Sequence, residues 1–128
     1  MTRAIADTSI FIASESGREL RVEAIPDEIC VSIITIGELR TGVLVAADTR
    51  SRGRRLATLE RALTLDPVPV DDQVAEAWAV LSVELRTLGL RMPVNDSWIA
   101  ATAIALGVPV VTQDDDYQTV PGLEVIRV

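Results

Sequence analysis

Short apolar segments alternate with longer stretches of helical spacing along the whole chain. Residues 3–6 are apolar and short, residues 29–34 are rich in β-branched side chains, and residues 110–112 are Val and Thr. Segments of this length and composition predict buried parallel strands. A closing strand is expected within residues 123–128, because a Pro-Gly turn at 121–122 precedes it.

The segments between these predicted strands have helical spacing or helix-start residues. Asp7 ends the first apolar segment and should begin a helix. Thr35 is followed three residues later by Glu38, which is the pattern of a capping box opening a helix. Residues 48–65 predict a second, more polar helix. An amphipathic helix capped by Asp71 or Asp72 should then run to Gly89, since its apolar residues recur with helical spacing.

The most apolar helix is expected between Pro93 and Gly107. Asn95 or Asp96 should cap its start, and Gly107 should end it. From Trp98 to Leu106 only Thr102 is markedly polar, so this helix should be buried centrally. Alternating strands and helices predict a single α/β domain over residues 1–128, with a mainly parallel central sheet and helices on both faces.

Composition narrows the possible chemistry. The chain has 128 residues, no histidine, no lysine and one cysteine, and its 12 basic residues are all arginine. Zinc sites built on His and Cys, and serine nucleophiles activated by His or Lys, are therefore excluded. The 19 acidic residues give a net charge of −7, which argues against a general nucleic-acid-binding surface. A lone Cys30 and the absence of a long apolar run predict a cytoplasmic location.

Four acids recur at the ends of strands or the starts of helices: Asp7, Glu38, Asp96 and Asp114. In a parallel sheet these positions lie along one edge, where ligands bind. Clustered carboxylates repel one another, and a divalent cation removes that cost. Oxygen ligands without His or Cys favour Mg²⁺ or Mn²⁺. Such ions support phosphodiester hydrolysis, because they activate water and neutralise charge that develops on phosphorus.

Each acid also has a plain structural interpretation. Asp7 and Asp96 could be helix caps, and Glu38 could be only the return arm of a capping box. These interpretations explain one acid at a time and do not explain why four fall on one edge. Either Asp114 or Asp116 could face the site, whereas Asp115 is expected to be a solvated turn residue.

Other residues are assigned supporting or structural roles. The polar side chains expected to support the carboxylates are Ser9, Asn95 and Thr112. Trp78 and Trp98 are most simply core aromatics. A run of arginines at one helix start has two interpretations, a solvated helix end or a patch that contacts phosphate. Its members are Arg50, Arg52, Arg54 and Arg55.

The motifs together resemble the PIN-domain family, specifically the VapC-type toxins of toxin–antitoxin pairs. They are Asp7-Thr8-Ser9, the segment TIGELR at 35–40, NDSWIAATA at 95–103 and VVTQDDDY at 110–117. The resemblance covers essentially the whole chain. It implies a three-layer fold and a metal-dependent endoribonuclease in which Asp7, Glu38, Asp96 and Asp114 form the acidic quartet. The implied metal ligands are Asp7 and Asp96, with Asp114 or Asp116.

The resemblance also implies a cognate antitoxin that inhibits the toxin, and a homodimer. Whether one or two metal ions act, and which RNA is cut, stay open. Two alternatives compete. Receiver domains and haloacid-dehalogenase-like phosphatases use a lysine that this chain lacks, and the phosphatases need an aspartate where Ser9 stands. A PIN-like module that binds RNA or protein without cleavage is opposed by the four intact acids.

Overall fold

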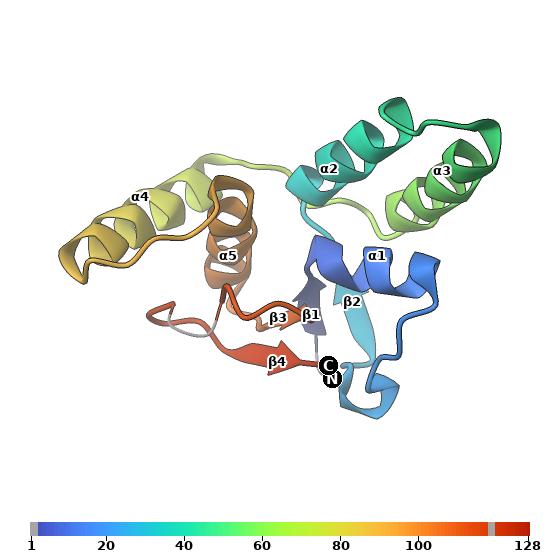
Figure 1. Ribbon diagram of the computed structural model, residues 1–128. Coiled ribbons are helices and arrows are strands. Elements are labelled where there is room, and N and C mark those ends of the chain that lie inside the picture. The colour runs from blue at the N-terminus through green and yellow to red at the C-terminus, as the bar shows by residue number, and fades with distance from the viewer. Residues whose placement is uncertain (1–2, 118–119) are drawn as a thin grey trace.

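The computed structural model describes residues 3–117 and 120–128 and contains a four-stranded parallel sheet. The strands lie in the order β2-β1-β3-β4 (Figure 1), and all three pairings are parallel. Their bounds are β1 Arg3–Ala6, β2 Glu28–Cys30, β3 Val110–Thr112 and β4 Val125–Arg127. The predicted parallel α/β fold is confirmed. With β1 and β3 at the centre, residues that follow these two strands share the carboxyl edge of the sheet.

Within the described residues, five α-helices and one short 3₁₀ helix surround the sheet. In Figure 1, α2 and α3 form an antiparallel hairpin beside α1, while α4 crosses α5 on the other side of the molecule. The helices are α1 Thr8–Ser16, the 3₁₀ helix η1 Val22–Ala24, α2 Ile33–Leu44, α3 Thr49–Leu63, α4 Asp72–Thr87 and α5 Val94–Leu106.

Alternation along β1 explains why helices cover both sheet faces. Ile5 belongs to a core cluster with Ile99 and Ala103 of α5 and Leu81 of α4. Its neighbour Ala4 belongs to a different cluster that includes residues of α1 and the η1 region. Successive strand residues point to opposite faces, so each face receives its own apolar layer. The α2–α3 hairpin packs through a third cluster that also includes Phe11 of α1.

The predicted strand over residues 29–34 is too long, and the predicted capping box is wrong. The strand ends at Cys30, and α2 begins at Ile33 with Ser32 as its N-cap. The Ser32 hydroxyl accepts a hydrogen bond from the Ile34 amide at 3.1 Å. Serine is a strong N-cap, and a short β-branched run does not distinguish a strand from a helix start. Thr35 therefore lies inside the first turn of α2 and is fully buried.

The start of α5 also differs from the prediction. Pro93 is the N-cap and makes no side-chain capping bond, so Asn95 and Asp96 lie within the first turn. Proline has a fixed φ that suits a helix entry, and it needs no amide partner there. Asp96 keeps a favourable place because negative charge in a first turn interacts well with the helix dipole. Gly107 ends α5 in the left-handed conformation, as predicted.

The predicted helix starts at Asp7 and at Asp71 are confirmed, and the helix predicted over residues 48–65 is capped by Asp48. Asp7, Asp48 and Asp71 each accept a backbone N–H in the first turn of α1, α3 and α4, respectively. The amphipathic helix α4 ends at Thr87, just before Gly89, which has a positive φ. Over the described ranges, no helix has the length and apolar character needed to cross a membrane.

Candidate carboxylate site

Three of the predicted acids stand directly at the carboxyl edge of the sheet or at a helix start facing it. Asp7 follows β1, and its backbone N–H bonds to Val111 of the neighbouring strand at 2.9 Å. Asp114 follows β3, and Asp96 occupies the first turn of α5. Glu38 comes from the second turn of α2, after β2. Four separate elements thus supply the four acids.

Asp7 is the most firmly held of these acids. Its side chain is 1% exposed and accepts three hydrogen bonds. Oδ2 accepts from the Ser9 amide at 3.3 Å and from the Thr112 hydroxyl at 3.0 Å, and Oδ1 accepts from the Tyr117 hydroxyl at 2.7 Å. A buried carboxylate with this many donors keeps one orientation. The cap and the site interpretation of Asp7 are compatible, because only one of the three donors is the helix amide.

Ser9 and Thr112 form a short relay that ends on Asp7. Because the Thr112 proton points to Asp7, the Ser9 hydroxyl donates to Thr112 Oγ1 at 3.2 Å. Ser9 Oγ also accepts from the Gln113 amide at 3.0 Å, and Thr112 Oγ1 accepts from the Asp114 amide at 2.9 Å. The two hydroxyls therefore tie the start of the aspartate run to Asp7.

Glu38 is oriented by two threonines. The Thr8 hydroxyl donates to Glu38 Oε1 at 2.7 Å. The buried Thr35 hydroxyl lies 2.9 Å from Thr8 Oγ1. Because the Thr8 proton points to Glu38, Thr35 donates to Thr8 in this pair. Glu38 is thus linked to the residue next to Asp7, although α1 and α2 are distant in sequence.

Asp96 is the acid whose ionisation is most perturbed. Burial, followed by the negative charges of Asp7 and Asp116, raises its pKa from 3.8 to about 7. A hydrogen bond with the Asp116 carboxyl and the charge of Glu38 act in the same direction. Desolvation and like charge both favour the protonated form. A carboxyl with a pKa near neutrality at a sheet edge marks a candidate functional site.

Two further groups are perturbed in the same direction. The pKa of Asp114 is raised by burial and by the charges of Asp7 and Asp116, while the charge of Arg18 opposes this weakly. The pKa of the buried Tyr117 phenol is raised by burial and by the Asp7 and Asp96 charges. Tyr117 therefore stays a hydrogen-bond donor to Asp7 at all ordinary pH values.

The acids are within electrostatic reach of one another but are not arranged as a finished metal site. Among residues 3–117 and 120–128, no three acidic or cysteine side chains converge so as to hold a metal ion. The described ion pairs join Arg3 to Glu28 and Arg127 to Asp115, so they leave the four acids without a paired arginine. The donors fit a hard divalent cation by type, because all are carboxylate oxygens.

The other residues named from the sequence differ in exposure and in the groups that they contact. Asn95 is exposed and forms no side-chain hydrogen bond with the residues described. Asp116 is exposed near Asp96, and Asp115 is exposed and paired with Arg127 at 3.2 Å. Trp78 and Trp98 stack between α4 and α5, with ring centroids 4.4 Å apart. Trp78 also donates to Ser97 Oγ at 2.9 Å.

The four arginines at the start of α3 do not behave as one patch. Arg50, Arg52 and Arg54 are exposed. Arg55 is partly buried and donates from Nη1 to the Gly42 carbonyl at 2.7 Å. Arg52 and Arg54 make longer contacts of 3.4 Å, to the Ala46 carbonyl and the Ser51 hydroxyl. Three of these side chains are thus available to solvent.

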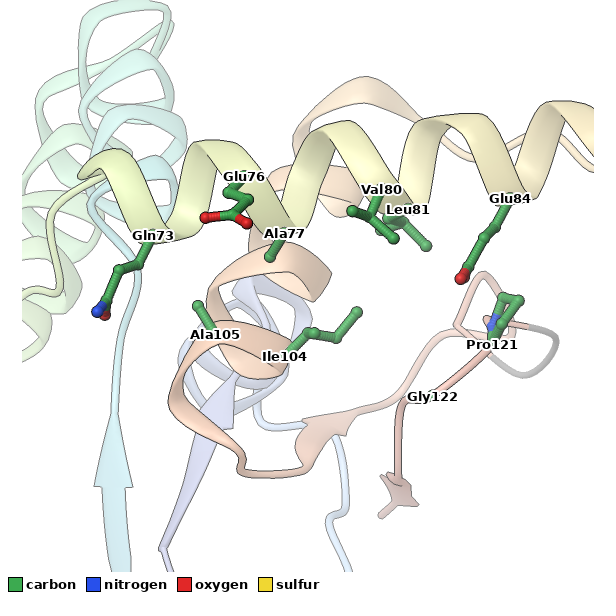
Figure 2. A pocket seen from close by; sticks show the side chains of 10 residues that line it. All are labelled: Gln73, Glu76, Ala77, Val80, Leu81, Glu84, Ile104, Ala105, Pro121 and Gly122. Atoms are coloured by element: carbon green, nitrogen blue, oxygen red, sulfur yellow. The ribbon is translucent and has the colours of Figure 1, made fainter.

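A separate cavity of about 510 Å³ lies between α4, α5 and the 121–122 turn, away from the acids. Figure 2 shows Ile104 and Ala105 beneath α4, with Pro121 and Gly122 at one end. Ile104 and Ala105 belong to the last turn of α5, whereas Asp96 belongs to its first turn. The acids and this cavity therefore lie at opposite ends of α5.

Sequence reasoning missed Tyr117 and Thr8. Tyr117 is the only tyrosine in the chain and directly follows the three aspartates, a signal that a buried phenol could serve the acids. Thr8 stands between Asp7 and Ser9, and a hydroxyl beside an expected site acid could have been tested as a hydrogen-bond donor. Neither pattern specifies which acid receives the proton, because that depends on contacts between distant segments.

Comparison with known proteins identifies the family. The PIN domain model matches residues 4–123. The chain belongs to the PIN-domain family. It is of the VapC type, being 48% identical over 127 residues to Ribonuclease VapC5 of Mycobacterium tuberculosis, with 97% of this chain and 94% of that protein covered.

Solved structures agree with this assignment. The crystal structure of VapBC-5, a member of the VapBC family of toxin–antitoxin systems from Mycobacterium tuberculosis, covers 100% of both chains, with a TM-score of 0.92 and 43% identity. DNA-bound VapBC from Salmonella typhimurium matches with a TM-score of 0.83 and 25% identity, covering 98% of this chain and 97% of that chain.

Proposed function

We propose that this VapC-type chain is a divalent-metal-dependent endoribonuclease and the toxin of a toxin–antitoxin pair. The observation on which this rests is the group of coupled carboxylates at the sheet edge, in a chain 48% identical to a protein named a ribonuclease. Acids that raise one another's pKa are destabilising unless something positive joins them. A hard cation is the natural partner, since all the donors are carboxylate oxygens.

The proposed ligands are Asp7 and Asp96, together with Asp114 or Asp116, and the ion is Mg²⁺ or Mn²⁺. When bound, such an ion supplies an activated water and neutralises charge on the phosphate. Asp7 would stay fixed by its three hydrogen bonds. The side chains of Asp96, Asp114 and Asp116 are only partly buried or exposed, so they are free to turn toward a shared ion.

The remaining chemistry falls to the chain's own residues. Thr8 holds Glu38 Oε1 in place, and Glu38 completes the proposed acidic quartet. Burial and the neighbouring carboxylates raise the pKa of Asp96 to about 7 in the metal-free protein, and a bound cation would favour its ionised form, as a ligand role requires. The three exposed arginines of α3 are proposed contacts for RNA phosphates.

The proposed partners follow from the relatives. VapBC-5 is described as a member of a family of toxin–antitoxin systems, so we infer a cognate antitoxin for this chain. RNA is the inferred substrate because the relative VapC5 is named a ribonuclease, and a homodimer is proposed from the resemblance to VapC-type toxins. The chain is proposed to be one PIN domain over residues 1–128 that acts in the cytoplasm.

Cleavage of RNA by purified protein tests the proposal. Wild type should cut RNA with Mg²⁺ or Mn²⁺ and stop when EDTA is added, while Asp7→Asn and Asp96→Asn should lose at least about 100-fold in rate. Asp72→Asn is the matched control, because Asp72 lies in the first turn of α4 and is exposed. Circular dichroism checks that each variant is folded.

Two results would contradict the proposal. One is the absence of metal-dependent cleavage by folded wild type, which would favour a PIN-like module that binds RNA or protein without cutting. The other is equal cleavage by wild type, Asp7→Asn and Asp96→Asn, since the activity would then arise elsewhere. Sequencing of the fragment ends identifies the bond that is cut.

A further inference from the structure

A second cavity adjoins the carboxylate site. It lies where α1 packs beside the α2–α3 hairpin (Figure 1) and has a volume of about 270 Å³. Its lining residues are Ile12, Glu15, Glu38, Leu39, Gly42 and Arg55. Glu38 belongs to both the cavity lining and the acidic quartet, so the cavity and the acids are neighbours through this one side chain.

The walls of this cavity combine apolar and polar groups. Ile12 is 42% exposed and Leu39 is buried, so both present aliphatic surface. Gly42 leaves the wall open: a Cβ added there would meet only the Arg55 side chain, at 3.8 Å. The volume is slightly below the roughly 300–1,000 Å³ of small-molecule sites, so it suits one flat ring system rather than an extended ligand.

Hydrogen bonds hold both polar groups in place, one to Thr58 outside the cavity and one to the backbone of Gly42 in its wall. Glu15 Oε1 accepts from the buried Thr58 hydroxyl at 2.9 Å, which fixes the carboxylate and leaves Oε2 without a hydrogen bond among the described residues. Arg55 donates one N–H to the Gly42 carbonyl at 2.7 Å, and its guanidinium has further N–H groups that can donate to a ligand. An anchored acceptor and an anchored donor therefore face the same small space.

We propose that this cavity is a subsite that receives a guanine base of the RNA, next to the bond that is cut. The proposal rests on the ribonuclease function proposed above. The Watson–Crick edge of guanine offers two adjacent donors, N1–H and the N2 amino group, which match a carboxylate, and its O6 and N7 acceptors match an arginine. Single-stranded bases splayed from the stack are read on these edges.

The same chemistry ranks the other bases. Uracil has one N–H flanked by two carbonyls, which an acidic wall repels. Adenine and cytosine each have one amino group but no second donor beside it. Glu15 is thus a specificity-determining residue. We expect the protein to prefer guanine over uracil by about 10-fold or more.

The test uses short oligoribonucleotides that differ only at one position near the mapped cut. Cleavage is measured as kcat/KM with Mn²⁺, and binding is measured separately by fluorescence anisotropy in EDTA at low salt. The variants are Glu15→Gln, which keeps an acceptor for Thr58, and Gly42→Leu, which fills the cavity from a helical position. Glu60→Gln is the control, because Glu60 is exposed on α3 and lies outside the cavity lining.

Wild type and Glu60→Gln should prefer guanine at one position by about 10-fold or more, in binding and in cleavage. Glu15→Gln and Gly42→Leu should reduce the preference for guanine to about twofold or less. The melting temperature of Gly42→Leu should be no lower than that of wild type, because leucine favours a helix more than glycine does.

An equal loss of binding for all four bases in Glu15→Gln, or no guanine preference in wild type, would overturn the subsite. The binding measurement in EDTA distinguishes failure of the guanine subsite from failure of the proposed ribonuclease function. A guanine preference in EDTA that is lost in Glu15→Gln supports the subsite even if no RNA is cut, whereas cleavage without any base preference supports the ribonuclease and overturns the subsite.

Discussion

Replacing Asp96 by asparagine should stabilise the metal-free protein above neutral pH. The pKa of this carboxyl rises from 3.8 to about 7, which corresponds to about 4 kcal/mol at about 1.4 kcal/mol per pH unit. Asp96 is partly exposed, so solvent screening reduces the expected effect to about 2 kcal/mol. Asparagine removes the charge and retains a group that can hydrogen-bond to Asp116.

The sign of the pH dependence follows from linkage. The folded state binds the Asp96 proton more tightly than the unfolded state does. The stability contributed by this group is therefore complete below about pH 4 and is lost as pH rises through about 7. Asp96→Asn should match wild type near pH 4 and exceed it by about 2 kcal/mol at pH 8, which is about 5–10 °C in melting temperature.

Urea unfolding in EDTA at pH 4, 6 and 8 measures this difference directly. The control is Asp72→Asn, which should stay within about 0.5 kcal/mol of wild type at each pH. With saturating Mn²⁺ the order should reverse, because wild type gains stability by mass action and Asp96→Asn loses a ligand. A variant no more stable than wild type at pH 8 in EDTA would refute the inference that Asp96 lies in an uncompensated cluster.

Three more predictions follow from individual contacts. Tyr117→Phe removes a 2.7 Å hydrogen bond to buried Asp7 and should lower the free energy of unfolding by about 1.5–3 kcal/mol; a loss below about 0.5 kcal/mol in urea titrations would contradict it. Thr8→Val frees Glu38 and should lower kcat/KM about 10-fold with little change in KM, and Thr8→Ser should restore it. Replacing Arg50 and Arg54 by Gln should reduce the salt dependence of RNA binding by about one to two phosphate contacts; an unchanged slope would return these arginines to a solvated helix end.

Local sequence rules predicted much of the fold. Asp48, Asp71 and Gly107 mark helix ends as expected, because caps depend on a few neighbouring residues. The same rules failed where two local signals compete. Ser32 and Thr35 both can begin a helix, and the choice depends on where β2 stops pairing with β1 at Cys30.

The candidate site was predicted in outline and not in detail. Acids after apolar segments place Asp7 and Asp114 on one edge, since parallel strands share a direction. The hydrogen-bond partners of the acids come from distant segments: the Tyr117 hydroxyl donates to Asp7, 110 positions away, and the Thr8 hydroxyl donates to Glu38, 30 positions away. Only the packing of α1 against β3 and the α2–α3 hairpin brings them together, and no short motif encodes that packing.

Binding of Mn²⁺ to the metal-free protein is the most direct measure of the central claim that the carboxylate edge holds a divalent cation. Electron paramagnetic resonance of free Mn²⁺ during a titration should show saturable uptake at pH 8 by wild type and by Asp72→Asn, with weaker uptake at pH 5, where Asp96 is protonated. The affinity of Asp96→Asn for Mn²⁺ should be at least about 10-fold lower than that of wild type. Equal uptake by wild type and Asp96→Asn, or none by folded wild type at millimolar Mn²⁺, would contradict the account.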